Sequence, residues 1–305
     1  MAGWLLLKTV PIIILGVILA EFIVSLGWVD RLSFLARPIT RFSHLQDECG
    51  IIFLSAFASP TSANSMLANY YNKGVIEKKE LFLAAMINTF PAILMHWRSM
   101  LPILLPLLGL AGLLYFLILV LVALVKTSLL MIVARLILKK RAASKTSIEK
   151  KKILPLKEAF CTALKNSNYT IKRIIMVIIP TLILSCLLIE LGVFERLSHL
   201  LKGVILYFPI PSEGLGIVAA FLAHSNAAYT VAGSLLSAGE LTQKGVVLSL
   251  LIGSVLSSVV MVFQYIMPYY IGIFGPKIGL QLVGISEIIR NGITIIFIFG
   301  LAIFW

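Results

Sequence analysis

Two short polar clusters interrupt apolar segments and carry the most distinctive ligand chemistry of the chain. The first follows an apolar run at 49–58 and offers Ser59, Thr61, Ser62 and Asn64, with Pro60 at the break. The second follows an apolar run at 214–223 and offers His224, Ser225, Asn226, Tyr229 and Thr230. Hydroxyl, amide and carbonyl oxygens suit a hard cation such as sodium, or a polar, hydroxyl-rich solute. The alternative is that these groups bond to one another across a close helix contact.

Metal and catalytic chemistry have weak support. His224 has no second metal ligand nearby, so a hydrogen-bonded tip residue is favoured over a metal ligand or proton carrier. The three cysteines, Cys49, Cys161 and Cys186, have no metal-ligand spacing. A phosphate-binding glycine loop and a nucleophile elbow are both missing. We therefore expect no catalytic residue, no bound metal and no enzyme activity.

Five charged residues lie inside long apolar segments, where each costs about 2.5–3.5 kcal/mol on insertion scales and needs a partner or a purpose. They are Glu21, Lys126, Glu190, Glu287 and Arg290. Acidic and basic segments of this kind predict ion pairs across the helix bundle. Such pairs either fix the packing or compensate charge along a solute path, and Glu21 and Glu190 have the further alternative of reaching the membrane interface.

Glu48 and Glu213 occupy a different position, because each lies at the start of the first arm of a polar-broken segment. A carboxylate there is stabilised by the helix dipole and can cap the helix. We expect both to cap their arms. Asn88 and Thr89, ahead of Pro91, are further candidates to line a cavity opposite the first cluster, with interhelical hydrogen bonding as the alternative.

The composition places all these residues in a membrane protein. Hydrophobic residues make up 60% and charged residues 13% of the chain, and the mean hydropathy is +1.03. A spanning helix needs about 20 apolar residues, and several stretches of that length occur. Only helices and closed barrels satisfy the backbone in lipid, and strand-like alternation is missing. The prediction is an all-α, polytopic integral membrane protein.

An internal repeat organises the chain. The segment 26–35 (LGWVDRLSFL) matches 191–200 (LGVFERLSHL), with Asp30 replaced by Glu195. Each unit is predicted to contain a span, an amphipathic interfacial helix, a polar-broken segment, a second span, a proline-marked turn and a last span. In the first unit these are 5–28, 30–45, 49–71, 80–97, a turn near Pro102 and Pro106, and 109–137; in the second they are 170–193, 195–209, 214–237, 245–265, a turn near Pro268, and 279–304. The domains are thus 1–138 and 169–305, joined by a linker at 139–168.

The polar-broken segments decide the topology. A ten-residue helical arm rises about 15 Å, half the hydrocarbon core, so two arms predict a re-entrant hairpin with its tip near the midplane. The alternative is one full span with a polar middle. Three spans plus a hairpin make the repeats inverted, whereas four spans make them parallel. The strongly basic linker is predicted to be cytoplasmic. Inversion then places seven further basic residues inside and five outside, and the positive-inside rule favours it: Arg31, Arg37, Arg41, Lys73, Lys78, Lys79 and Lys277 against Lys8, Arg98, Arg196, Lys202 and Lys244.

The repeated Leu-Gly…Arg-Leu-Ser segment, followed by the polar breaks at 59–64 and 224–226, resembles the Gate, or nucleoside-recognition, superfamily. That group takes in concentrative nucleoside transporters, the membrane part of ferrous-iron transporters and spore maturation membrane proteins. In the nucleoside transporters, paired re-entrant hairpins of inverted repeats hold solute and sodium at their tips. The resemblance implies such a role for 59–64 and 225–230. The chain has no nucleoside-binding signature to match and no GTPase domain like that of the iron transporters.

These expectations combine into one functional hypothesis. The chain is a secondary transporter of the cell membrane that moves a small polar, nucleoside-like solute or an ion by alternating access at the hairpin tips. We expect no cofactor other than a coupling sodium ion or proton. The expected partners are membrane lipid and the solute or ion, with no nucleic acid, and a homo-oligomer is possible. The alternative is a non-transporting membrane scaffold or assembly partner of the spore maturation type.

Overall fold

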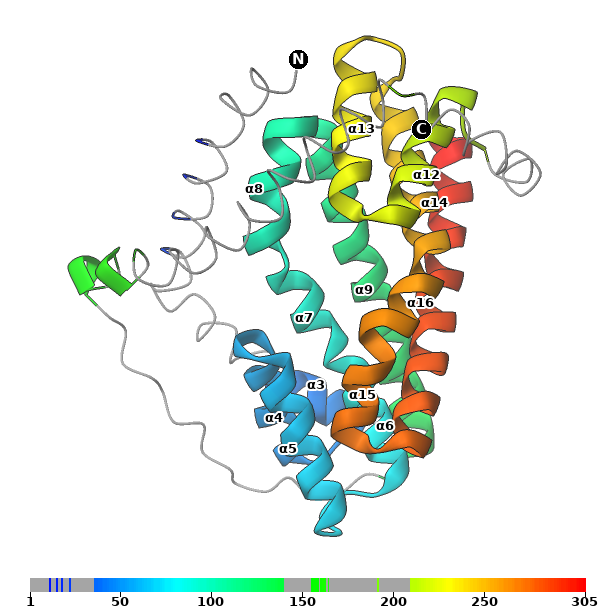
Figure 1. The fold of residues 1–305 in the computed structure, drawn as a ribbon. Helices are drawn as coiled ribbons and strands as arrows, with labels where there is room; N and C mark the ends of the chain where they lie inside the picture. The colour runs from blue at the N-terminus through cyan, green and yellow to red at the C-terminus, as the bar shows by residue number, and fades with distance from the viewer. Residues whose placement is uncertain are drawn as a thin grey trace.

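The computed structural model describes residues 36–139 and 209–305, with a few positions at 11–22, 155–164 and 191. Within these ranges every regular element is a helix (Figure 1). The predicted first spans at 5–28 and 170–193, the segment 195–209 and most of the basic linker fall outside the described residues. Glu21 and Glu190 fall outside them as well.

The described part contains the same order of helices twice. The first series is α3 (Ala36–Ser43), α4 (Asp47–Ala58), α5 (Pro60–Asn72), α6 (Lys78–Ile87), α7 (Thr89–Met95), α8 (Trp97–Leu108) and α9 (Leu110–Ile137). The second is the 3-10 turn η2 (Ser212–Gly214), α12 (Leu215–Ala223), α13 (Ser225–Ser237), α14 (Gln243–Met261), the π-helical turn η3 (Val262–Ile266), α15 (Met267–Phe274) and α16 (Pro276–Phe304). Helix α13 begins and ends 165 positions after α5, and α14 begins 165 positions after α6. The offset found in the sequence therefore also relates the helix boundaries.

Each polar-broken segment forms two short helices that fold back on each other. The break is a single extended residue, Ser59 between α4 and α5 (φ −152°, ψ 102°) and His224 between α12 and α13 (φ −168°, ψ 142°). The Ser55 hydroxyl lies 3.9 Å from the Met66 sulfur across the first pair. The Phe221 and Tyr229 rings meet edge to face at 6.1 Å across the second. Figure 1 shows the two hairpins toward opposite ends of the molecule.

The chain reverses at glycines, not at the predicted prolines. Pro102 and Pro106 lie inside α8, and Pro268 lies in the first turn of α15. The reversals occur at Gly109 (φ 55°) and Gly275 (φ 78°), where only glycine adopts the left-handed region without strain. The prolines instead accompany helix distortion: α6–α7 and α8 form a pair bent by 43°, and the π-helical turn η3 directly precedes α15. The predicted turns near Pro102, Pro106 and Pro268 were therefore wrong.

Three described helices, α9, α14 and α16, are long and apolar enough to cross a membrane, and the bent pair would be a fourth. Helices α9 and α16 pack against each other in opposite directions (Figure 1). Ala134, near the end of α9, belongs to one apolar core with Leu282, near the start of α16. Tyr115, near the start of α9, belongs to a second core with Ile298, near the end of α16. Each core surrounds one hairpin.

Candidate functional site

The tip of the first hairpin is smaller than the sequence indicated. The helix resumes at Pro60, so Thr61, Ser62 and Asn64 belong to the first turn of α5 instead of a loop. Thr61 is exposed, whereas Asn64 is 3% exposed and points to α15. The Asn64 amide nitrogen donates to the Tyr269 hydroxyl at 3.2 Å, and the Tyr270 hydroxyl also reaches Asn64. The Asn64 amide oxygen is buried and has no hydrogen-bond partner among the residues that the structure describes.

The tip of the second hairpin is held by its histidine. The His224 Nδ1 atom accepts the backbone N–H of Asn226 at 3.1 Å and so caps α13. A ring nitrogen that accepts an N–H carries no proton, so Nδ1 is the acceptor of this cap. The Thr230 hydroxyl donates to the Asn226 carbonyl at 2.9 Å. His224 is therefore the hydrogen-bonded tip residue that the sequence favoured.

Behind this tip lies a buried group of hydroxyls. Tyr229 is 5% exposed and Tyr115, from α9, is 1% exposed; their rings meet edge to face at 6.1 Å. The Tyr115 hydroxyl hydrogen-bonds with Tyr229 and Ser254, and the Tyr229 hydroxyl also reaches Ser225. Ser225 and Tyr229, both predicted site residues, thus share one network with groups from α9 and α14.

Lys126 forms the centre of the molecule's charged interior. Its side chain is 2% exposed, and its ammonium donates to the Ser286 hydroxyl of α16 at 2.6 Å and to the Thr89 hydroxyl at 3.3 Å. Thr89 begins α7 just after Asn88, where the helix breaks ahead of Pro91. This contact is an interhelical hydrogen bond, the alternative given for Thr89, and the cavity-lining role of Asn88 and Thr89 stays a prediction. Lys126 also lies within electrostatic range of Glu287 and Arg290.

Arg290 forms an ion pair with a carboxylate of its own helix, α16. Its guanidinium lies 2.6 Å from the Glu287 carboxylate, three residues earlier on α16. The same guanidinium donates to the Asn291 side chain at 3.1 Å, which in turn donates to the Ser258 hydroxyl at 2.9 Å. Among the described residues the pairing is therefore within one helix, and the predicted pairing across the bundle with Glu21 or Glu190 stays a prediction.

Some of these groups are in contact and others lie only within electrostatic range of one another, and together they form a polar series between the two hairpin tips. From the first tip, Asn64 reaches Tyr270, and Tyr270 lies within electrostatic range of Glu287. Glu287 pairs with Arg290, and Arg290 lies within electrostatic range of Tyr115. Tyr115 connects to the second tip through its hydrogen bond to Tyr229. This polar series lies within an apolar interior, where unpaired polar groups are costly.

The predicted capping roles of Glu48 and Glu213 were wrong. The N-cap residues are Gln46 for α4 and Gly214 for α12, and neither helix has a side-chain cap. Glu80 of α6, 3% exposed, takes over at the first hairpin: its carboxylate accepts the Gln46 backbone N–H at 2.8 Å and the Gln46 amide at 3.2 Å. Glu48 and Glu213 do lie in the first turns, where the helix dipole favours a carboxylate.

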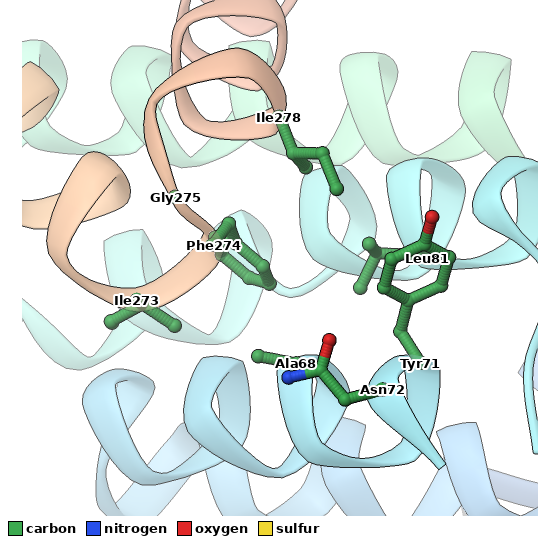
Figure 2. A pocket seen from close by; sticks show the side chains of 8 residues that line it. All are labelled: Ala68, Tyr71, Asn72, Leu81, Ile273, Phe274, Gly275 and Ile278. Carbon is green, nitrogen blue, oxygen red and sulfur yellow. The ribbon is translucent and has the colours of Figure 1, made fainter. Parts of the chain in front are cut away.

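A small pocket of about 190 Å³ lies away from both tips, at the base of the first hairpin. Figure 2 shows Ala68, Tyr71 and Asn72 of α5 across from Phe274 and Ile278 at the α15–α16 turn. None of the predicted site residues lines it. Tyr71 and Asn72 bring polar side chains to its lining, beside the apolar side chains of Leu81, Ile273 and Phe274.

Sequence reasoning missed the residues that contact the tips and Lys126, namely Tyr115, Tyr269, Tyr270 and Ser286, and Ser254, which contacts Tyr115. A tyrosine or serine in an apolar helix gives no sign of its partner, because the contact joins segments far apart in the chain. One signal was present for the first hairpin: adjacent Tyr269 and Tyr270 follow Pro268 in an otherwise apolar stretch.

Helices long enough to span a bilayer, two helical hairpins and a buried polar series indicate a helical membrane protein. The Gate family, described as nucleoside recognition, matches residues 6–97, within the first unit. The chain is 36% identical over 291 residues to uncharacterized protein MJ1556 of Methanocaldococcus jannaschii, covering 95% of this chain and 92% of that protein. MJ0880 and MJ0871, uncharacterized proteins of the same archaeon, are each 28% identical and cover 98% and 95% of this chain, and 98% and 91% of their own length.

The chain belongs to the Gate family. That membership gives it a membrane, transport-related role, in a family associated with transport and not catalysis. No solved structure matches the chain.

Proposed function

We propose that the protein is a multi-pass secondary transporter of the cell membrane that moves a small polar solute by alternating access between its two hairpin tips. The observation that carries this proposal is the polar series from Asn64 to Ser225. Buried polar and charged groups in a membrane bundle are expensive and typically mark solute or ion paths.

The hairpins are proposed to be re-entrant, with bases on opposite faces of the membrane. Their arms contain 9 to 13 residues, too few to cross a core that needs about 20. His44, at the base of the first hairpin, contacts the carbonyl of Leu138 at the end of α9 (3.2 Å). Lys244, near the base of the second, donates to the Ala302 carbonyl near the end of α16 (3.0 Å). Because α9 and α16 run in opposite directions, these contacts support inverted repeats.

Helix α3 is proposed to lie at the membrane interface. It is short and strongly amphipathic, with Arg37 and Arg41 on a segment that also carries Ile39 and Phe42. It packs against α4 and α9, and Arg135 of α9 lies over the Phe42 ring at 4.9 Å. Basic and aromatic residues of this kind anchor helices at lipid headgroups. The basic linker would then lie on the same, cytoplasmic side as the end of α9.

Transport is tested with purified protein in vesicles, with a sodium or proton gradient imposed across the membrane. Labelled nucleosides, organic anions and inorganic cations are offered in turn. The proposal predicts gradient-dependent uptake of at least one solute and none into empty vesicles. Absence of flux for every solute, in either gradient, would contradict it.

The tip residues are tested with matched asparagine variants. Asn64→Ala removes the buried amide that contacts Tyr269, and Asn226→Ala changes the second tip. Asn69→Ala, on the exposed face of α5, is the control. The expected result is that both tip variants lose the increase in thermal stability that the transported solute gives, while the control keeps it.

A further inference from the structure

The charge balance around Lys126 is uneven. Lys126 and Arg290 carry two positive charges, and Glu287 is the carboxylate within electrostatic range of Lys126 among the described residues. Two cations and one carboxylate leave one net positive charge, with Lys126 buried and Arg290 and Glu287 partly exposed. Burying a net charge is expensive without a counter-ion. The centre therefore calls for an anion.

The Lys126 ammonium also has hydrogen-bonding capacity to spare. It carries three N–H donors, and within the described part of the chain two acceptors are present, the hydroxyls of Ser286 and Thr89. Both acceptors come from other helices, α16 and the start of α7, so the ammonium sits where three helices meet. One N–H remains for a further acceptor.

Two buried polar side chains belong to residues that are adjacent in sequence to Thr89 and Lys126. Within the described part of the chain, the Asn88 amide nitrogen and the Thr127 hydroxyl have no hydrogen-bond partner; both side chains are 4% exposed. Asn88 precedes Thr89 and Thr127 follows Lys126, the two residues already joined by a hydrogen bond. An amide nitrogen and a hydroxyl can each donate to an anion, and leaving them unpaired in the interior is unfavourable.

We propose that the Lys126 centre binds the anionic group, a carboxylate or a phosphate, of the transported solute. This assignment rests on the proposed transport function and deepens it by naming the substrate class. The same charge balance disfavours a metal cation, which would face Lys126 and Arg290 together. The counter-charge has two other sources, an acidic lipid headgroup and the carboxylates of Glu21 or Glu190, and the experiment separates all three.

Anion binding is measured as thermal stabilisation of the full-length protein in neutral detergent at constant ionic strength. The probes are phosphate, acetate and a nucleoside monophosphate, with chloride as the reference. A hundredfold excess over the dissociation constant should raise the melting temperature by roughly 5 °C for a chain of this size. Lys126→Met, which keeps an unbranched side chain one heavy atom shorter and removes its charge, should abolish the shift, and Lys126→Arg should retain part of it. Lys79→Met, at an exposed lysine, should leave it unchanged.

Four outcomes would overturn the proposal. The first is no shift with any soluble anion, and the second is an undiminished shift in Lys126→Met. The third is stabilisation by phosphatidylglycerol alone, which would assign the charge to lipid. The fourth is restored stability when Glu21→Gln or Glu190→Gln is added to Lys126→Met, since that identifies a static ion pair.

If Lys126→Met does not fold, Ser286→Ala provides the second variant. It removes the closest acceptor of the ammonium and should weaken anion binding about tenfold while keeping the charge; unchanged anion affinity would count against the proposal.

Flux measurements separate this proposal from the transport function itself. Uptake of a neutral or cationic solute that is unchanged in Lys126→Met would refute anion recognition and leave transport standing. Anion binding without any flux would do the reverse.

Discussion

The Glu287–Arg290 pair makes a directional prediction about stability. Glu287→Gln leaves Arg290 and Lys126 near each other with no described carboxylate in range, whereas Arg290→Gln leaves Glu287 with Lys126 as a compensating cation. Each substitution removes one charge; Glu287→Gln keeps the size of the side chain, and Arg290→Gln shortens it by two heavy atoms. The charge balance therefore predicts that Glu287→Gln is the more harmful variant.

The magnitude follows from the pair's separation and exposure. The charged atoms are 2.6 Å apart, with side-chain exposures of 29% for Arg290 and 16% for Glu287. Two unit charges about 4 Å apart attract by about 4 kcal/mol at an effective dielectric constant near 20, and removing one partner of a buried pair costs about 3–5 kcal/mol. We expect the free energy of unfolding to fall by about 4 kcal/mol in Glu287→Gln. In Arg290→Gln it should fall by about 2 kcal/mol, because Lys126 remains as a cation near Glu287.

Thermal unfolding of the purified variants in detergent measures this difference. At roughly 2 °C per kcal/mol for a large chain, the melting temperature should fall by about 8 °C for Glu287→Gln and about 4 °C for Arg290→Gln. The double variant should lose less than the sum of the two, because the residues are in contact. Equal losses, or a larger loss for Arg290→Gln, would refute the reasoning that Glu287 compensates two cations.

Three further predictions concern the framework around the hairpins. Gly253→Ala should lower the free energy of unfolding by about 1–3 kcal/mol, because its new Cβ would lie 2.9 Å from the Phe221 ring and Cβ. The control Gly284→Ala has open space around it and should be neutral or stabilising. Equal melting temperatures for the two variants would contradict the packing. Glu80→Leu should lower the free energy of unfolding by about 2 kcal/mol, because two donors of Gln46, at the N-terminus of α4, lose their acceptor. An unchanged unfolding transition would argue against a stabilising role of Glu80. His224→Ala should lower the free energy of unfolding by about 1 kcal/mol, because the cap of α13 is lost. His224→Asn should recover most of that loss. A failure of this rescue in the same thermal unfolding assay would count against capping.

Much of the secondary structure could be predicted from the sequence. Polar residues flanked by apolar runs located both helix breaks, at Ser59 and His224, and the repeat offset predicted corresponding boundaries in the two units. Gly74 and Gly239, aligned by that offset, both have positive φ (71° and 75°). The signal was strong because a helix break in apolar surroundings requires an unusual local composition.

The positions of the chain reversals could not be predicted by weighting proline. Pro102 and Pro106 are accommodated within α8, where tertiary packing overrides their helix-breaking tendency. Glycine was the better signal, since Gly109 and Gly275 each precede a long helix and supply the positive φ of the turn.

The site was only partly predictable for a different reason. Residues with an unusual type in an apolar segment, such as Lys126 and Arg290, stand out in the sequence. Their partners, such as Ser286 and Tyr115, do not, because small hydroxyl residues and tyrosines are common in helix interfaces. Glu80 was missed because it lies among charged residues at the start of α6, where a solvated position is the ordinary expectation.

The central claim is that each hairpin enters and leaves the membrane on one face, with the two hairpins on opposite faces. Single cysteines at Gln46, Lys73, Ser212 and Glu240, in a chain with its own three cysteines replaced, test this in intact cells with a membrane-impermeant maleimide. The account predicts that Gln46 and Lys73 are shielded on the cytoplasmic side and that Ser212 and Glu240 are labelled from outside. Labelling that places Gln46 and Lys73 on opposite sides of the membrane would contradict it.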